Sequence, residues 1–149
     1  MRHRFKTYEQ LVSHIESISS DNHTVLGNWT AGQNFYHLAS AFQGSIDGLP
    51  DAFSPLVRAI LHPGRKLVTH FRFPPWLPIP KSIRHKLSPP TDACFEIQKK
   101  RLLAEIRRFL EFQDEYPPHP VLGKLTRNEW YGFHLRHCEH HLAFIELGT

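Results

Sequence analysis

Apolar residues recur at helical spacing in four stretches of this chain of 149 residues. The stretches cover about 8–19, 31–47, 92–115 and 127–147, and in each of them apolar residues return every three or four positions. Such a pattern places the apolar residues on one face of a helix and the polar residues on the opposite face. The sequence therefore predicts four amphipathic helices that pack their apolar faces together.

Three of these stretches open with a helix-start signal. Thr7, Thr30 and Thr126 are each followed three residues later by Gln or Glu. In a capping box the Thr hydroxyl accepts from a backbone N–H of the first turn, while the Gln or Glu side chain binds the cap in return. Gly48 and the two prolines after Tyr116 are stop signals for the second and third helices.

The prolines all lie between residues 50 and 120, outside the four predicted helices. Six of the twelve crowd into 74–90. Because proline does not fit a helix interior, we expect a short helix at 55–61 and, within the proline-rich segment 62–91, an extended strap that begins at Phe71 and packs against the helices. The whole connection between the second and third helices exceeds 40 residues, which is long enough for a crossover.

A connection of this length lets the second and third helices run parallel. We therefore predict an all-α fold with a single domain, 1–149. It is a four-helix bundle of up-down-down-up order, with a long proline-rich crossover between helices two and three. The chain shows no internal repeat and no alternating pattern strong enough to predict a strand.

Charge and hydropathy argue against two classes of partner, nucleic acids and membranes. Lys and Arg number 18 against 14 Asp and Glu, a net charge of +4, and the basic run at 99–108 is interrupted by Glu105. This pattern favours a solvated helix face over a nucleic-acid interface. No apolar stretch approaches the roughly 18 residues of a membrane span, and two cysteines are too few for a disulfide framework. The N-terminus also lacks a secretory signal, so we expect a soluble, cytoplasmic protein.

Four histidines lie within eight positions of the last predicted helix, at 134, 137, 140 and 141. Residues four apart lie one turn above each other, so His137 and His141 can bind one metal ion. Both occupy core positions, where two neutral imidazoles need partners for their polar nitrogens and one ion satisfies both. Zinc-type sites usually take three protein ligands, and His37, the only histidine of the second helix, is the best third candidate.

Other residues near this face are candidates for the wall of the site. Asn34 shares a face of the second helix with the histidine there, and Trp130 lies along the same arc as His137. His134 lies one turn before His137. It is a candidate for a general acid–base role, and the alternative is a structural hydrogen bond. Cys138 lies beside this face, and we interpret it as a buried structural thiol.

Two segments resemble the DinB-like, or damage-inducible, superfamily. The segment 27–37, Gly-Asn-Trp-Thr-Ala-Gly-Gln-Asn-Phe-Tyr-His, resembles the start of its second helix, where a Trp-Thr or Trp-Ser cap precedes a metal-ligand histidine. The spacing of His137 and His141 resembles its last helix, and 119–142 is similar to a branch with a histidine-rich last helix. The resemblance implies a four-helix bundle with a divalent ion, zinc or nickel foremost, held by His37, His137 and His141.

The same resemblance suggests a function. Some members transfer low-molecular-weight thiols onto electrophiles or isomerise small acids with a thiol. We therefore expect a metal-dependent enzyme of thiol-transferase or hydrolase type whose partner is a small molecule, with a low-molecular-weight thiol as one candidate. The alternative is a non-catalytic metal- or small-ligand-binding stress-response module, and a homodimer stays open. Many relatives have Arg-Gly-Gln after the last ligand histidine, where this chain has Leu142-Ala143-Phe144, so contacts of those polar residues do not carry over.

Overall fold

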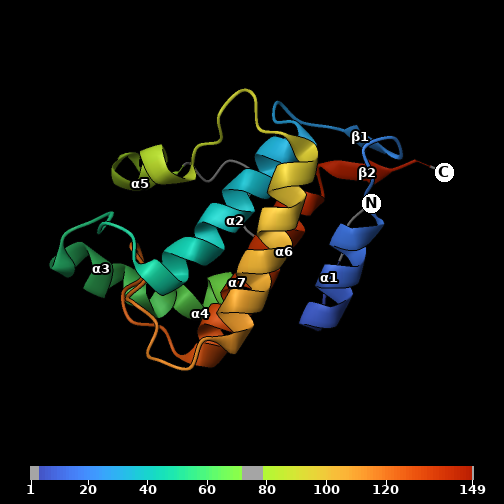
Figure 1. The fold of residues 1–149 in the computed structure, drawn as a ribbon. Coiled ribbons are helices and arrows are strands. Elements are labelled where there is room, and N and C mark those ends of the chain that lie inside the picture. The colour runs from blue at the N-terminus through green and yellow to red at the C-terminus, as the bar shows by residue number, and fades with distance from the viewer. Residues whose placement is uncertain (1–3, 72–78, 149) are drawn as a thin grey trace.

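The computed structural model describes residues 4–71 and 79–148, and this part of the chain is mostly helical, as predicted (Figure 1). Its elements in chain order are α1 (Tyr8–Ser17), β1 (His23–Val25), α2 (Ala31–Asp47), α3 (Pro55–Leu61), the 3₁₀ turn η1 (His62–Gly64), α4 (Arg65–His70), α5 (Lys81–Leu87), α6 (Phe95–Glu111), α7 (Arg127–Leu142) and β2 (Ile145–Leu147). Within the described ranges, no helix is both long and apolar enough to span a membrane.

Side-chain caps fix where three of the long helices begin. Complete capping boxes are present at Thr30 and Thr126, and they start α2 and α7 as the sequence predicts. Thr7 also caps α1, because its hydroxyl accepts from the backbone N–H of Gln10. The Gln10 side chain accepts from the backbone N–H of Lys6 instead of closing a box on the cap residue. Each cap supplies an acceptor for a first-turn N–H that has no partner inside its helix.

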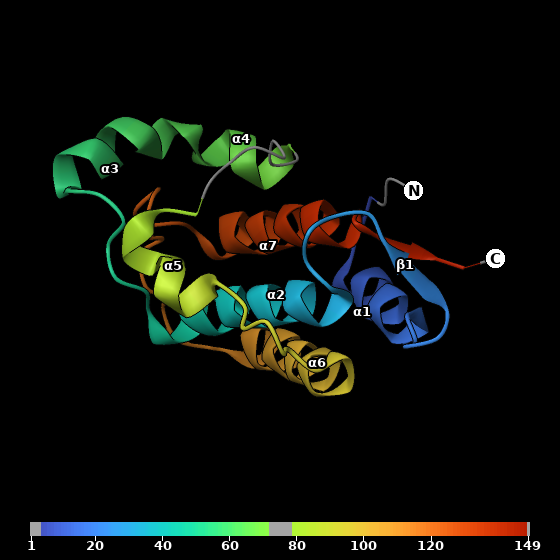
Figure 2. The same ribbon diagram turned by 90° about the horizontal axis from the view of Figure 1, so that it is seen from above.

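The two helices of 17 residues, α2 and α6, lie side by side and run parallel (Figures 1 and 2). Phe35 lies beside Phe95 near their N-terminal ends, with ring centroids 5.4 Å apart, and Phe42 lies beside Phe109 near the C-terminal ends, at 5.3 Å. Contacts that advance together along both helices require a parallel pair. The length of the connection between them predicts this arrangement.

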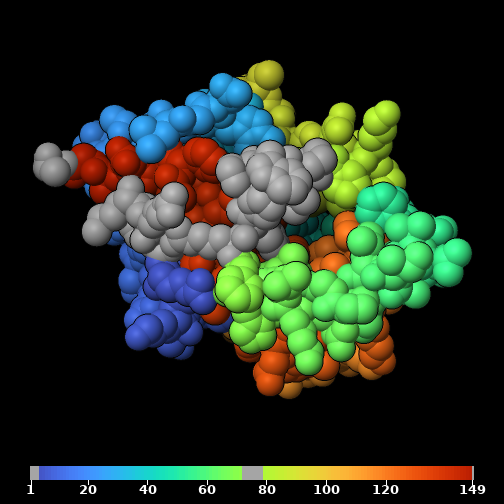
Figure 3. All heavy atoms as spheres, turned by 180° about the vertical axis from the view of Figure 1, so that it is seen from behind, coloured from blue at the N-terminus to red at the C-terminus, as the bar shows by residue number. Residues whose placement is uncertain are grey.

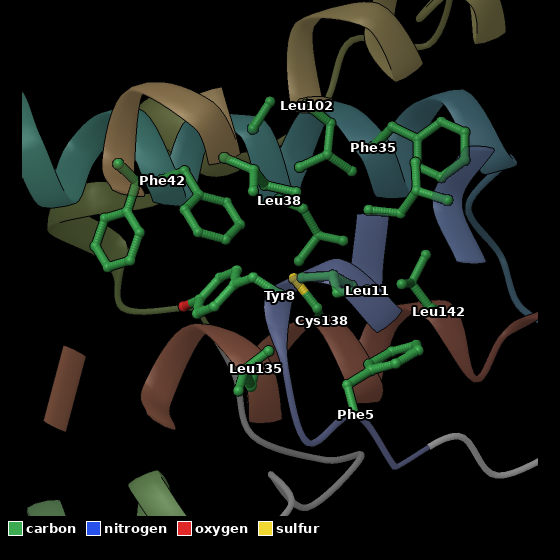
Figure 4. Packing of buried hydrophobic residues seen from close by; sticks show 14 of the residues in the cluster. Phe5, Tyr8, Leu11, Phe35, Leu38, Phe42, Leu102, Leu135, Cys138 and Leu142 are labelled. Atoms are coloured by element: carbon green, nitrogen blue, oxygen red, sulfur yellow. The ribbon is translucent and has the colours of Figure 1, made fainter. Parts of the chain in front are cut away.

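Helix α7 runs antiparallel to α2. Asn34, early in α2, contacts His141 at the end of α7, whereas Ser45, late in α2, contacts His134. Helix α1 packs on the same core, where Tyr8 donates to the backbone oxygen of Tyr131. Figure 4 shows how these helices bury their apolar faces together, with Phe5, Tyr8, Leu11, Phe35, Leu38, Phe42, Leu102, Leu135, Cys138 and Leu142 labelled.

The C-terminal end of the chain differs from its prediction. Helix α7 ends at Leu142 rather than near 147, and β2 then pairs antiparallel with β1, Ile145 opposite Val25. No strand was predicted, because three residues are too few to establish an alternating pattern. The buried Ile145 explains the pairing, since a β-branched side chain packs well on a pleated surface. Helices α1 and α6 also end earlier than predicted, at Ser17 and Glu111.

The crossover is more helical than predicted. The short helix at 55–61 is confirmed as α3, but the extended strap predicted from Phe71 onward is wrong for α5; α4 precedes that strap and is an additional helix, and 72–78 lie outside the described residues. The physical reason is the placement of the prolines: neither 65–70 nor 81–87 contains one, and Pro80 only precedes α5. Helix α4 packs against α7 and α5 against α2, so the crossover covers two helices of the core.

Candidate metal centre

Three histidines from two antiparallel helices meet in the interior of the protein. His37 comes from the middle of α2, and His137 and His141 come from the last two turns of α7. The Nε2 atoms of His37 and His137 are 3.1 Å apart, and one ring nitrogen from each of the three histidines lies within 4.8 Å of the other two. The structure therefore brings together the three residues that the sequence singles out as ligands.

The backbone of the crossover orients His37. Its Nδ1 lies 2.9 Å from the carbonyl oxygen of Leu87, at the end of α5. Because a carbonyl only accepts, Nδ1 carries the proton and donates it, which leaves the lone pair on Nε2. That lone pair points at the Nε2 of His137, so a proton or a cation must separate the two nitrogens.

A buried amide orients His141 in the same way. The side-chain nitrogen of Asn34 donates to the backbone oxygens of Thr30, at 3.0 Å, and Trp29, at 3.4 Å. This fixes the Asn34 Oδ1 as the acceptor that faces His141 Nδ1, 3.1 Å away. His141 therefore donates from Nδ1 and keeps its lone pair on Nε2, the nitrogen that is left for a metal ion.

Burial keeps these imidazoles neutral. It lowers the pKa of His37 to about 4, against 6.5 for an ordinary histidine. The pKa values of His137 and His141 are also held well below the ordinary value, first by burial and then by the neighbouring imidazoles of the cluster. Neutral rings retain the lone pairs that a metal needs, and protons compete for them only in acid.

The donor set fits a divalent ion of the zinc type. With Zn–N bonds of about 2.0–2.1 Å and tetrahedral angles, two ligand nitrogens lie about 3.3 Å apart. The 3.1 Å between the Nε2 atoms of His37 and His137 is within a few tenths of an ångström of that separation. Three nitrogens within 4.8 Å of one another can bind one ion if the side chains approach each other by up to about 1.5 Å.

The other residues singled out by the sequence lie around this cluster, not in it. His134 is buried, donates from Nε2 to the Ser45 hydroxyl at 3.0 Å, and stacks on Phe42. Its contacts are those of a structural hydrogen-bonding residue. Cys138 lies in the apolar core, where burial raises the pKa of its thiol. Trp130 is buried beside His134 and lines the cavity described next.

A cavity of about 670 Å³ opens beside the three histidines. It extends from Trp29 and the histidines past α2 and α5 to residues 119–122, and Val68 of α4 forms part of its wall. Trp29 stacks on His141 with ring centroids 5.8 Å apart. Figure 3 shows this side of the molecule, with α4 in green next to the residues around 120 in orange. The volume falls in the range of about 300–1,000 Å³ that is typical of small-molecule sites.

Two features of the site carried no usable signal in the sequence. The first is the Leu87 carbonyl that orients His37, because a backbone acceptor leaves no trace in the residue type. The second is His119, which lines the cavity and lies 4.7 Å from the ring of Phe133. The segment around His119 resembled a known branch, but nothing in its spacing placed it near the histidines of α7.

Fold and site together define a mostly helical protein with a three-histidine cluster at the edge of a cavity of about 670 Å³. The chain belongs to the family described as protein of unknown function (DUF1569), whose match covers residues 1–147. No curated protein and no solved structure matches the chain significantly.

Proposed function

We propose that this protein is a DinB-like four-helix-bundle domain that binds a divalent metal ion through His37, His137 and His141. The observation that carries the proposal is the convergence of one nitrogen from each histidine within 4.8 Å. The acceptors opposite the Nδ1 atoms of His37 and His141 add support, because they leave Nε2 of both rings as the ligand atom. Zinc and nickel are the leading candidates, since imidazole suits both.

We further propose that the site acts on a small molecule, as a metal-dependent enzyme of thiol-transferase or hydrolase type. Three protein ligands leave a coordination position open, where a bound divalent ion supplies Lewis-acid chemistry and favours the anion of a water or a thiol. The Leu87 carbonyl holds the imidazole of His37 in place, and the Asn34 side chain holds that of His141. Trp29 shields one side of the cluster. The cavity beside the cluster is large enough for a small substrate.

Metal analysis of the untagged protein tests the site. We expect about one divalent ion per chain, and its loss in His37→Ala, His137→Ala and His141→Ala, because two imidazoles bind an ion far more weakly than three. His85→Ala is the matched control, since His85 is exposed on α5 and outside the cluster. Stoichiometric metal in all three cluster variants would overturn the assignment.

The second candidate is a non-catalytic metal- or small-ligand-binding module. One observation favours it: apart from its histidines, the described wall of the cavity offers no Asp, Glu or Lys to serve as a general acid or base. An activity assay with low-molecular-weight thiols and a panel of electrophiles distinguishes the enzyme from the non-catalytic module. Metal-dependent turnover that is absent in the triple histidine variant supports the enzyme, whereas metal and ligand binding without turnover supports the module.

A further inference from the structure

Away from the histidine cluster, the described wall of the cavity is uncharged. Charged residues make up 21% of the chain, yet no Asp, Glu, Lys or Arg lines the cavity among the residues that the structure describes. Apolar side chains form much of the wall away from the histidines, including Ala41 of α2, Val68 of α4, and Ile83 and Leu87 of α5. Away from the histidine cluster, a charged group would lose its hydration and find no opposite charge among the described residues of the wall.

His119 gives this wall a neutral hydrogen-bond donor. Its Nδ1 accepts the backbone N–H groups of Val121, at 3.1 Å, and Leu122, at 3.2 Å. The ring proton therefore resides on Nε2. Burial lowers the pKa of His119 to about 3, so the ring is uncharged at neutral pH. Within the cavity, His119 can donate from Nε2 to a neutral acceptor such as a carbonyl oxygen.

His119 and the histidine cluster are separated by one aromatic ring. The ring of Phe133 lies 4.7 Å from that of His119 on one side and 5.6 Å from that of His137 on the other. All three residues line the cavity. A ligand that reaches both histidines must therefore be elongated, with its middle part against Phe133.

We propose that this cavity binds an uncharged, largely apolar small molecule that carries a hydrogen-bond acceptor. The acceptor binds Nε2–H of His119, the apolar part lies along Phe133 and α5, and the opposite end faces the histidine cluster. This inference rests on the proposed function for the role of that opposite end and names the class of its substrate. At the His119 end of the cavity it favours a neutral amide, ester or ketone over a carboxylate or a phosphate.

Three probes of similar shape test the proposal by titration calorimetry: 4-phenylbutanamide, 4-phenylbutanoate and butylbenzene. Metal-free protein is used, so that probe binding is independent of the metal site. We expect the amide to bind at least about tenfold more tightly than the carboxylate, because only the carboxylate brings an uncompensated charge into the cavity. A carboxylate that binds as tightly as the amide overturns the proposal, and this comparison needs no variant.

Two neighbouring positions on α4 provide a matched pair of variants. Val68 lines the cavity, whereas Leu67 is 61% exposed and does not. Val68→Glu places a carboxylate in the wall, and we expect it to weaken amide binding about tenfold or more, while Leu67→Glu leaves it unchanged. Equal amide affinity in the two variants, both folded by circular dichroism, contradicts the location of the site.

His119→Asn tests the donor. The Asn oxygen replaces Nδ1 as the acceptor for the N–H groups of Val121 and Leu122, but the variant has no counterpart of Nε2–H. We expect about fivefold weaker binding of the amide and unchanged binding of butylbenzene, which has no acceptor. An equal loss for both probes would indicate a structural role only. Metal content, measured separately, reports on the proposed function, so the failure of one proposal is distinguishable from the failure of the other.

Discussion

Replacing Asn34 by Leu is expected to weaken metal binding without removing a ligand. Asn34 is 2% exposed, and its side chain joins the start of α2 to the cluster. The amide nitrogen donates to the Thr30 carbonyl, and Oδ1 accepts from His141 Nδ1 at 3.1 Å. Leu has the same number and branching of side-chain heavy atoms but cannot accept, so the His141 ring loses the bond that fixes both its orientation and its tautomer.

The size of the effect follows from the role of this bond. Loss of a group that hydrogen-bonds the free N–H of a ligand histidine typically costs about 10- to 100-fold in metal affinity. This corresponds to about 1.4–2.7 kcal/mol of binding free energy. We expect the upper half of that range, because the partly buried Nδ1–H of His141 is left in the apolar surroundings of Leu instead of in water.

Competition between the metal-free protein and a chromophoric zinc chelator measures the dissociation constant of the protein's zinc complex. Ser45→Ala is the matched control, since it also removes the acceptor of a buried histidine of α7, but that histidine is His134, outside the cluster. Ser45→Ala should lower stability and leave metal affinity unchanged. If Asn34→Leu binds zinc within about twofold of the wild type, the Asn34–His141 bond does not orient a ligand.

Two further predictions concern stability. The pKa of His119 falls from 6.5 to about 3 on folding. Below pH 6.5 the unfolded chain therefore binds a proton at this residue that the folded chain does not bind. We expect acid to destabilise the protein from that pH downward. Between pH 6.5 and about pH 5 this residue alone should cost about 2 kcal/mol in urea unfolding, a loss absent from His119→Asn. Gly32→Ala should destabilise the protein by about 2 kcal/mol or more, because the new Cβ would lie 2.2 Å from the backbone oxygen of Ala93. The same urea unfolding measures this loss.

Controls for both predictions lie in the chain. Subtracting the pH profile of His119→Asn from that of the wild type cancels the other buried histidines, and equal slopes for the two proteins would show that His119 is not protected from protons. Gly64→Ala is the control for Gly32→Ala, since a Cβ at Gly64 meets no atom within 4 Å. It should change stability by less than about 0.5 kcal/mol. Gly32→Ala with wild-type stability would mean that α2 and the residues before α6 can separate freely.

The sequence predicts the members of the cluster from helical spacing together with the family resemblance. His137 and His141 are one turn apart on the last predicted helix, and His37 is the only histidine of the second. The length of the connection predicts the parallel direction of α2 and α6, since a short loop would have forced them antiparallel. These inferences succeed where local spacing or chain length determines the geometry.

Other features depend on contacts between distant segments, and they do not follow from the residue pattern. The pairing of Val25 with Ile145 joins two strands of three residues that have no alternation to reveal them. The bond from His37 to the Leu87 carbonyl spans 50 residues and uses the backbone, so the identity of residue 87 does not indicate it. His119 reaches the cavity only because the segment after α6 folds back across α7.

The crossover between α2 and α6 is therefore part of the site rather than a passive connection. Helix α5 supplies the carbonyl that orients His37, and Ile83 and Leu87 of the same helix also form cavity wall. A shift of α5 would therefore change the orientation of His37, a candidate metal ligand, and the shape of the cavity together. Because this coupling passes through one backbone oxygen, it depends on the position of α5 and not on its side-chain chemistry.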